Sequence, residues 1–106
     1  MKMIFLHGFP DNSRTWDHLV AHFQNHSPCH APDIHSLTLS QQVALIGELA
    51  AGEPLVLIAH DMGGPAAVEF AQKNQQQVKH LILINSMGLD MFAHRLRSLD
   101  QLLKSS

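Results

Sequence analysis

The sequence predicts an α/β fold, a parallel sheet of about four strands with helices on both faces. Short apolar runs bounded by turn residues alternate along the chain with segments whose apolar residues recur at helical spacing. Runs that are apolar throughout are typical of parallel strands, because helices cover both faces of such sheets. The 106 residues contain no repeat, low-complexity tract or linker, so we expect a single domain over residues 1–106.

Three clear apolar runs and one weaker run are the predicted strands. The clear runs are residues 3–6, 55–59 and 81–84, and the weaker run lies at residues 28–31. The weaker run ends at Pro32-Asp33, where we expect Asp33 to be a structural turn residue. It contains Cys29, the only cysteine, which excludes an internal disulfide and is expected to be a small buried residue.

Helices are predicted between the strands by apolar spacing and by start and stop residues. A core-facing stripe at i, i+3, i+4 and i+7 predicts the first: Trp16, Leu19, Val20 and Phe23. For the second, Ser40 is the expected N-cap, and Gly52 and Pro54 are the expected stop.

A third helix is predicted from about residue 63 to residue 74, and a fourth over residues 91–103. The expected packing face of the third helix is Ala66, Ala67, Phe70 and Ala71. Strands and helices that alternate in this way form parallel sheets through crossover connections.

Charge and hydropathy exclude several classes of partner. The net charge is −2 with histidine neutral and no basic run is present, so we expect no nucleic-acid partner. The longest apolar runs are far shorter than a bilayer span, so we expect no membrane segment. Met1 opens almost directly onto a strand, which leaves no room for a signal peptide. With a single cysteine, these features make the cytoplasm the default expectation.

Nine histidines are scattered along the chain, and three of them share helical spacing: His18, His22 and His26. Such spacing is able to place metal ligands on one helix face. No cysteine or carboxylate cluster completes a site there, so we interpret the three as a solvated face. We expect no metal and no cofactor.

Candidate site residues follow the predicted strands, because ligands of open parallel sheets bind at the carboxyl ends of strands. These residues are His7, Gly8, Phe9, Pro10, His60, Asp61, Met62, Asn85 and Ser86. Asn85 and Ser86 either line the mouth of the site or form an ordinary strand-end turn, which is the plainer interpretation.

The run Ala59-His60-Asp61-Met62-Gly63-Gly64 has the pattern of a nucleophile elbow, a sharp turn between a buried strand and a helix. The central residue points its side chain to solvent, and the residues two before and two after it must be small. Ala59 and Gly63 meet that requirement. The alternative interpretation is that Asp61 simply caps the following helix, a role in which aspartate is common.

With the loop HGFP placed before HDMGG, the chain resembles the N-terminal half of the α/β-hydrolase superfamily over roughly residues 1–86. The motif pair is most similar to the branch of epoxide hydrolases and haloalkane or haloacetate dehalogenases, in which aspartate replaces serine. The resemblance implies a truncated α/β-hydrolase core, with residues 88–106 as a possible start of the lid. It also implies a small-molecule substrate.

By this resemblance, Asp61 is the nucleophile, and the oxyanion hole consists of the backbone N–H groups of Phe9 and Met62. An ionised carboxylate attacks an sp³ carbon and forms an alkyl-enzyme ester, which implies cleavage of an epoxide or a carbon–halogen bond. Each oxyanion donor is worth on the order of 3 kcal/mol. Met62 stands where haloalkane dehalogenases and many epoxide hydrolases have a tryptophan. The loss of that side-chain N–H removes one ligand of a leaving halide, which argues against haloalkanes.

The resemblance also leaves two other functions open. Nothing after Ser86 matches the family's late acid and catalytic histidine, so the enzyme interpretation requires pairing with the missing half. We also expect a homodimer or a complementing chain. Bare sheet edges favour such pairing. The alternative is a non-catalytic truncated or pseudo-hydrolase that binds a small ligand or partner protein. A third possibility is an esterase-like ancestor that lost function when aspartate replaced serine.

Overall fold

A computed structural model describes residues 1–8 and 12–84 of the chain. Its strands form one parallel four-stranded sheet in the order β2-β1-β3-β4. The strands are β1 (Lys2–Leu6), β2 (Cys29–His30), β3 (Leu55–His60) and β4 (Val78–Ile84). The helices are η1 (Ser13–Trp16), α1 (Asp17–Phe23), α2 (Leu39–Ala50), η2 (Asp61–Gly63) and α3 (Gly64–Lys73), where η marks a 3₁₀ turn.

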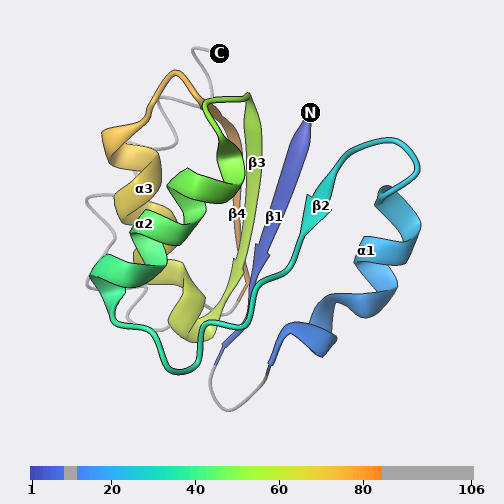
Figure 1. The fold of residues 1–106 in the computed structure, drawn as a ribbon, viewed down its shortest axis with the longest axis horizontal. Helices are drawn as coiled ribbons and strands as arrows, with labels where there is room; N and C mark the ends of the chain where they lie inside the picture. The colour runs from blue at the N-terminus through green and yellow to red at the C-terminus, as the bar shows by residue number, and fades with distance from the viewer. Residues whose placement is uncertain (9–11, 85–106) are drawn as a thin grey trace.

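Helices lie on both faces of the sheet, with α1 on one face and α2 and α3 on the other (Figure 1). The predicted fold class is therefore confirmed. β1 and β3 are the central strands, and their chains leave toward opposite faces, β1 to α1 and β3 to α3. This is a topological switch point, the place where open α/β sheets form their binding crevice. Leu6 is in register with Ala59, so the two strands end side by side.

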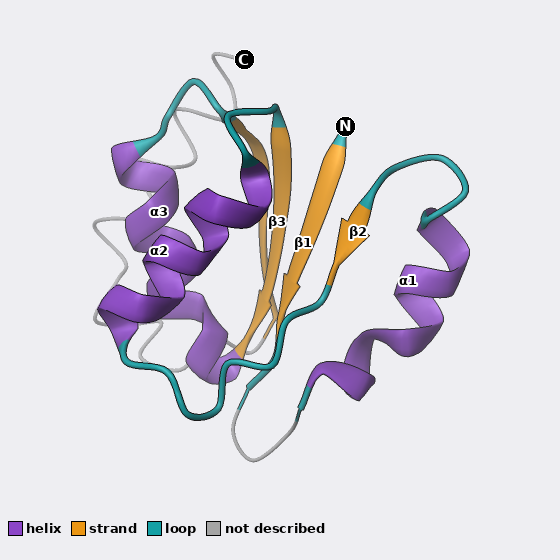
Figure 2. Ribbon diagram, in the orientation of Figure 1, coloured by secondary structure: helices purple, strands orange, loops and turns teal. Residues whose placement is uncertain are grey.

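The two faces bury different amounts of apolar side chain. The larger core cluster lies under α2 and α3 and includes Ile4, Leu6, Leu57, Ile46 and Phe70, each at most 4% exposed. On the α1 face the buried residues are Phe5, Trp16 and Ile58, with the Phe5 and Trp16 rings 5.4 Å apart. Most of the buried apolar side chains therefore lie between the sheet and the helices α2 and α3. The ribbon view shows these two helices on one face of the sheet and α1 on the other (Figure 2).

Strand positions agree with the prediction except at the start of β4. β4 begins at Val78, three residues before the predicted run at 81–84. Lys79 and His80 interrupt the apolar pattern, yet this stretch of backbone pairs with β3 through an irregular register between Leu55 and Val56. β4 lies at the edge of the described sheet, where the ladder needs backbone groups but not apolar side chains on both faces.

The predicted stripe of the first helix is wrong at Leu19, whose side chain is 40% exposed. Trp16, the first residue of that stripe, is buried but belongs to η1, not to α1. A 3₁₀ turn advances the chain by three residues per turn, not 3.6, so a stripe drawn across both elements loses its alignment. α1 itself contains no fully buried residue.

The N-cap of α2 is Thr38, which corrects the prediction of Ser40. The Thr38 hydroxyl accepts a hydrogen bond from the Gln41 N–H at 3.2 Å, and Gln41 Oε1 accepts from the Thr38 N–H at 2.9 Å. This is a capping box, which satisfies two N–H groups reciprocally. Ala51 and Gly52 end the helix with φ of +51° and +74°, close to the predicted stop.

α3 agrees with prediction in both extent and packing face. Gly64–Lys73 lies within the predicted residues 63–74, and Ala66, Ala67, Phe70 and Ala71 are at most 4% exposed. Within the described residues, no helix has the length and hydropathy needed to cross a bilayer. The predicted helix at 91–103 and the possible lid start at 88–106 lie outside the described residues.

Candidate active site

Asp61 occupies the turn between β3 and α3 with a left-handed backbone, φ +50°. Few non-glycine residues adopt this region, although aspartate tolerates it better than most. No side-chain hydrogen bond caps either η2 or α3, and the N-cap positions are His60 and Gly63. The interpretation of Asp61 as a helix cap is therefore wrong. The turn has the strand–turn–helix geometry of the predicted elbow, and the Asp61 side chain is half-buried.

Gly63 is small because the end of β1 lies directly against it. A Cβ atom at Gly63 would stand 2.9 Å from Leu6 Cβ and 2.9 Å from the Leu6 carbonyl oxygen. Real Cβ atoms essentially never approach so closely, so any larger residue would push the elbow and β1 apart. The elbow pattern by itself places this requirement on the contact between β3 and its helix. The structure assigns it to β1.

Gly8, which belongs to the HGFP motif after β1, is also in close contact with the elbow. A Cβ atom at Gly8 would lie 2.5 Å from Asp61 Cβ and 3.0 Å from the His60 carbonyl oxygen. The residue after His7 and the residue at the centre of the elbow are therefore neighbours in space. Gly8, the residue directly before the predicted oxyanion residue Phe9, is in direct contact with Asp61.

His7 is a buried histidine, 2% exposed, whose ring positions the backbone around it. Its Nε2 accepts a hydrogen bond from the Ile34 N–H at 2.8 Å, and its Nδ1 lies 3.0 Å from the Gly8 carbonyl oxygen. Both contacts are satisfied together by the neutral tautomer with the proton on Nδ1. His7 thus joins the end of β1 to the segment after β2. The sequence predicted that His7 lines the site. In the structure, both of its ring nitrogens contact backbone groups, those of Ile34 and Gly8.

Asp33 is a structural residue, in line with the sequence interpretation. Its Oδ1 accepts a hydrogen bond from the Ser13 N–H at 3.1 Å and lies 3.3 Å from His7 Nε2. Because Nε2 already accepts from the Ile34 amide, it has no proton for Asp33 in this tautomer. We therefore regard the second contact as proximity and not as an ion pair.

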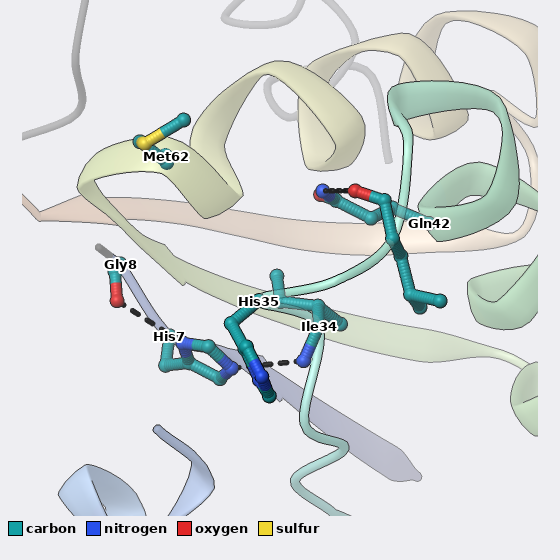
Figure 3. Close-up of a pocket in the computed structure, with 7 residues that line it drawn as sticks. His7, Gly8, Ile34, His35, Gln42 and Met62 are labelled. Atoms are coloured by element: carbon teal, nitrogen blue, oxygen red, sulfur yellow. Dashed lines mark hydrogen bonds between the residues drawn. The ribbon is translucent and has the colours of Figure 1, made fainter. Parts of the chain in front are cut away.

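A cavity of about 70 Å³ lies beside the elbow (Figure 3). Its lining residues are His7, Gly8, Ile34, His35, Leu37, Gln42 and Met62. His7, Gly8 and Met62 were predicted at the site, whereas the other four were missed. For Ile34, His35 and Leu37 the only signal in the sequence was their place just after the weak strand at 28–31, at the carboxyl edge of the sheet. Gln42 lies inside α2 and had no such signal.

Met62 is the second residue of η2, so its backbone N–H lies at a helix start, where amides lack intrahelical acceptors. That position suits the predicted oxyanion donor. The side chain of Met62 is 44% exposed. His60 does not line the cavity, but its half-buried ring places Nδ1 3.1 Å from where a Gly8 Cβ would be. The predicted residues Phe9, Pro10, Asn85 and Ser86 lie outside the described residues.

No cluster of three potential metal ligands occurs in the part of the chain that the structure describes. α1 ends at Phe23, so His26 lies beyond the helix that carries His18 and His22. The three histidines therefore do not form one helix face. That part of the sequence interpretation is wrong, because the helix is shorter than the spacing suggested.

A family model described as the alpha/beta hydrolase family matches residues 3–105 of this chain. Epoxide hydrolase 3 of Xenopus tropicalis is 28% identical over 99 residues, which cover 79% of this chain and 27% of the relative. Epoxide hydrolase 3 of Mus musculus is 29% identical over 98 residues, which cover 78% of this chain and 27% of the relative. The chain thus spans about a quarter of the length of these curated relatives.

Solved structures have the same fold. The crystal structure of the pyrethroid hydrolase PytH superposes with a TM-score of 0.70 at 19% identity, over 81% of this chain and 40% of that chain. That likeness concerns the fold alone. A structure described under novel epoxide hydrolases from metagenomes of hot environments has a TM-score of 0.66 at 29% identity, over 79% of this chain and 34% of that chain.

Proposed function

The chain belongs to the alpha/beta hydrolase family, and from that premise we propose that its reaction is epoxide hydrolysis, with Asp61 as the nucleophile. The observation that carries the proposal is the left-handed backbone of Asp61 in contact with Gly8. This contact brings a carboxylate against the loop that would supply the second oxyanion donor. The relatives named epoxide hydrolases support an epoxide over a carbon–halogen substrate.

The chemistry follows from what a carboxylate does in this position. Asp61 attacks a ring carbon of the epoxide, the C–O bond opens, and an alkyl-enzyme ester forms at Asp61. The ring oxygen leaves as an alkoxide and takes up a proton from water. A water molecule then attacks the ester at its carbonyl carbon and gives up a proton to solvent, and the oxyanion that develops there is stabilised by the Met62 N–H. Collapse of this intermediate breaks the ester C–O bond, releases the diol and restores the Asp61 carboxylate. Loss of one oxyanion donor typically lowers kcat about 100- to 1000-fold.

Intact-mass measurement tests the nucleophile directly. After incubation with an epoxide, the protein should gain the mass of one epoxide molecule, and peptide mapping should place it on Asp61. Asp61→Ala should abolish the adduct, whereas Asp17→Ala, which removes an exposed carboxylate at the start of α1, should retain it. An adduct that persists in Asp61→Ala contradicts the proposal. It would favour the alternative function of a ligand-binding pseudo-hydrolase.

A further inference from the structure

Gln42 presents a buried hydrogen-bond acceptor without a partner to the cavity beside the elbow. Its Nε2 donates a hydrogen bond to the Leu37 carbonyl oxygen at 3.1 Å. That contact fixes the orientation of the amide, because Oε1 is unable to donate to a carbonyl. Gln42 Oε1 is buried and has no hydrogen-bond partner among the described residues. A buried acceptor left unpaired costs about 1 to 3 kcal/mol, so this atom favours a donor from a ligand or from water.

The cavity wall around Gln42 Oε1 is mostly apolar. Ile34, Leu37 and Met62 supply the apolar surface, and no carboxylate, lysine or arginine is among the described residues that line the cavity. In the close-up, Met62 lies at the upper left and Gln42 at the upper right, with Gly8 and His7 from the end of β1 below Met62 and His35 at the lower centre (Figure 3). A ligand group that suits this lining is neutral, small and carries a hydrogen-bond donor.

The volume and the position of the cavity further restrict which ligand group it is able to bind. A volume of about 70 Å³ exceeds the share of a single water molecule, about 30 Å³. It matches a short arm that ends in a hydroxyl group. Gly8 and Met62 line the cavity, Gly8 contacts Asp61, and Met62 follows Asp61 in the chain. A molecule that reacts at Asp61 therefore has this cavity within reach of a neighbouring substituent.

We propose that the cavity is a specificity subsite for a hydroxyl-bearing arm of the substrate, with Gln42 Oε1 accepting the hydroxyl hydrogen. The substrate class is then epoxides with a hydroxyl group on the adjacent carbon, preferred over epoxides with an alkyl arm of equal size. This inference rests on the proposed function for the identity of the substrate. The preference for a hydroxyl arm, however, is a binding property and is measurable without turnover.

The experiment compares two inert ethers, 2-methoxyethanol and 1-methoxypropane, which have the same number of heavy atoms and differ by one hydroxyl group for one methyl group, so that only the first carries a hydrogen-bond donor. Each is titrated into the full chain while the backbone amide signals of Ile34 and Met62 are followed by NMR. 2-Methoxyethanol should bind about five-fold more tightly, the preference expected of one net neutral hydrogen bond. Gln42→Met, which keeps the side-chain length, should remove the preference. Gln76→Met, at an exposed turn, should retain it.

Equal affinities of the wild-type chain for the two ethers overturn the inference, and so does a preference that survives in Gln42→Met. If Gln42→Met fails to fold, the side-chain amide signal of Gln42 in the wild-type chain decides. A shift with 2-methoxyethanol and none with 1-methoxypropane supports the subsite, whereas no shift with either overturns it. An Asp61 adduct without a preference for the hydroxyl-bearing ether overturns the subsite alone. A preference for that ether without an adduct leaves the subsite standing and contradicts the nucleophile.

Discussion

The two faces of the sheet differ in how they are held. The face under α2 and α3 contributes fourteen of the buried core residues that the structure describes, whereas the α1 face contributes three. α2 begins with a capping box, but the N-cap of α1, Trp16, makes no side-chain cap. Burial on the α2 and α3 face therefore supplies most of the hydrophobic stabilisation. The α1 face positions the chain that leaves β1, mainly through Trp16.

The most direct test of this difference compares two neighbours on β3 that point to opposite faces. Leu57→Ala opens a cavity under α2 and α3 and should lower the free energy of unfolding by about 2 to 5 kcal/mol. Ile58→Ala removes a similar volume on the α1 face and should cost at least about 1 kcal/mol less, because fewer fixed neighbours surround it. Urea denaturation monitored by circular dichroism measures both. Equal losses would show that the two faces contribute alike.

A second comparison asks where an added methyl group is tolerated. Gly63→Ala forces a Cβ to within 2.9 Å of Leu6 and should destabilise the chain by about 1 to 3 kcal/mol. Gly47→Ala, in the interior of α2, places its Cβ 3.6 Å from Phe70, an ordinary contact. It should stabilise the chain by about 0.5 to 1 kcal/mol through helix propensity. Thermal unfolding distinguishes them, and a neutral Gly63→Ala would contradict the tight contact of the elbow with β1.

The cap of α2 provides a third test. Thr38→Ala should cost about 1 kcal/mol, because it leaves the Gln41 N–H without its acceptor. Ser40→Ala, at the position favoured by the sequence pattern, should change stability by less than about 0.5 kcal/mol, since Ser40 is exposed inside the helix. Chemical denaturation of both variants is the measurement. A larger loss in Ser40→Ala than in Thr38→Ala would restore the sequence-based cap.

The smallest expected effect concerns the ion pair between Lys2 and Glu53, 2.8 Å apart, which joins the start of β1 to the chain after α2. The hydrogen bond and the charge of Lys2 lower the pKa of Glu53 below its ordinary value. The contribution of this pair to stability is therefore present above the unfolded carboxyl's pKa, about 4.3, and is lost as the pH falls through the lowered value.

Wild type should accordingly be slightly more stable than Glu53→Gln at neutral pH, and the two should converge in acid. Denaturation curves across a pH series measure the difference, with Glu48→Gln as a control for an exposed glutamate on α2. A difference that persists unchanged well below pH 4 would show that Lys2 does not act through the charge of Glu53.

The sequence predicted the elements in which one packing requirement, burial against the core, selects apolar or small residues along the whole length. β1, β3 and the packing face of α3 are of this kind. The start of β4 was missed because an edge strand pairs through its backbone and accepts Lys79 and His80. Leu19 was misplaced because a 3₁₀ turn precedes α1 and shifts the period of the stripe.

The candidate site was predictable where sterics restrict residue type. The elbow pattern and the glycine after His7 leave such a signature, and the structure brings Gly8 and Asp61 into contact. The cavity was not predictable, because Ile34, His35 and Leu37 lie on an irregular segment whose position depends on the hydrogen bond from Ile34 to His7. Gln42 is one of three consecutive polar residues near the start of α2, and only tertiary packing distinguishes it.

The contacts at Gly8 and Gly63 have a consequence for anyone who intends to redesign this protein. Each glycine touches the segment that carries the other: Gly8 meets Asp61 on the elbow, and Gly63 meets Leu6 on β1. Substitutions at residues in such contact combine non-additively. A mutant library that diversifies the two positions independently should therefore return mostly glycine at both. Productive diversity lies at Ile34, Leu37 and Gln42, which shape the cavity without separating the two segments.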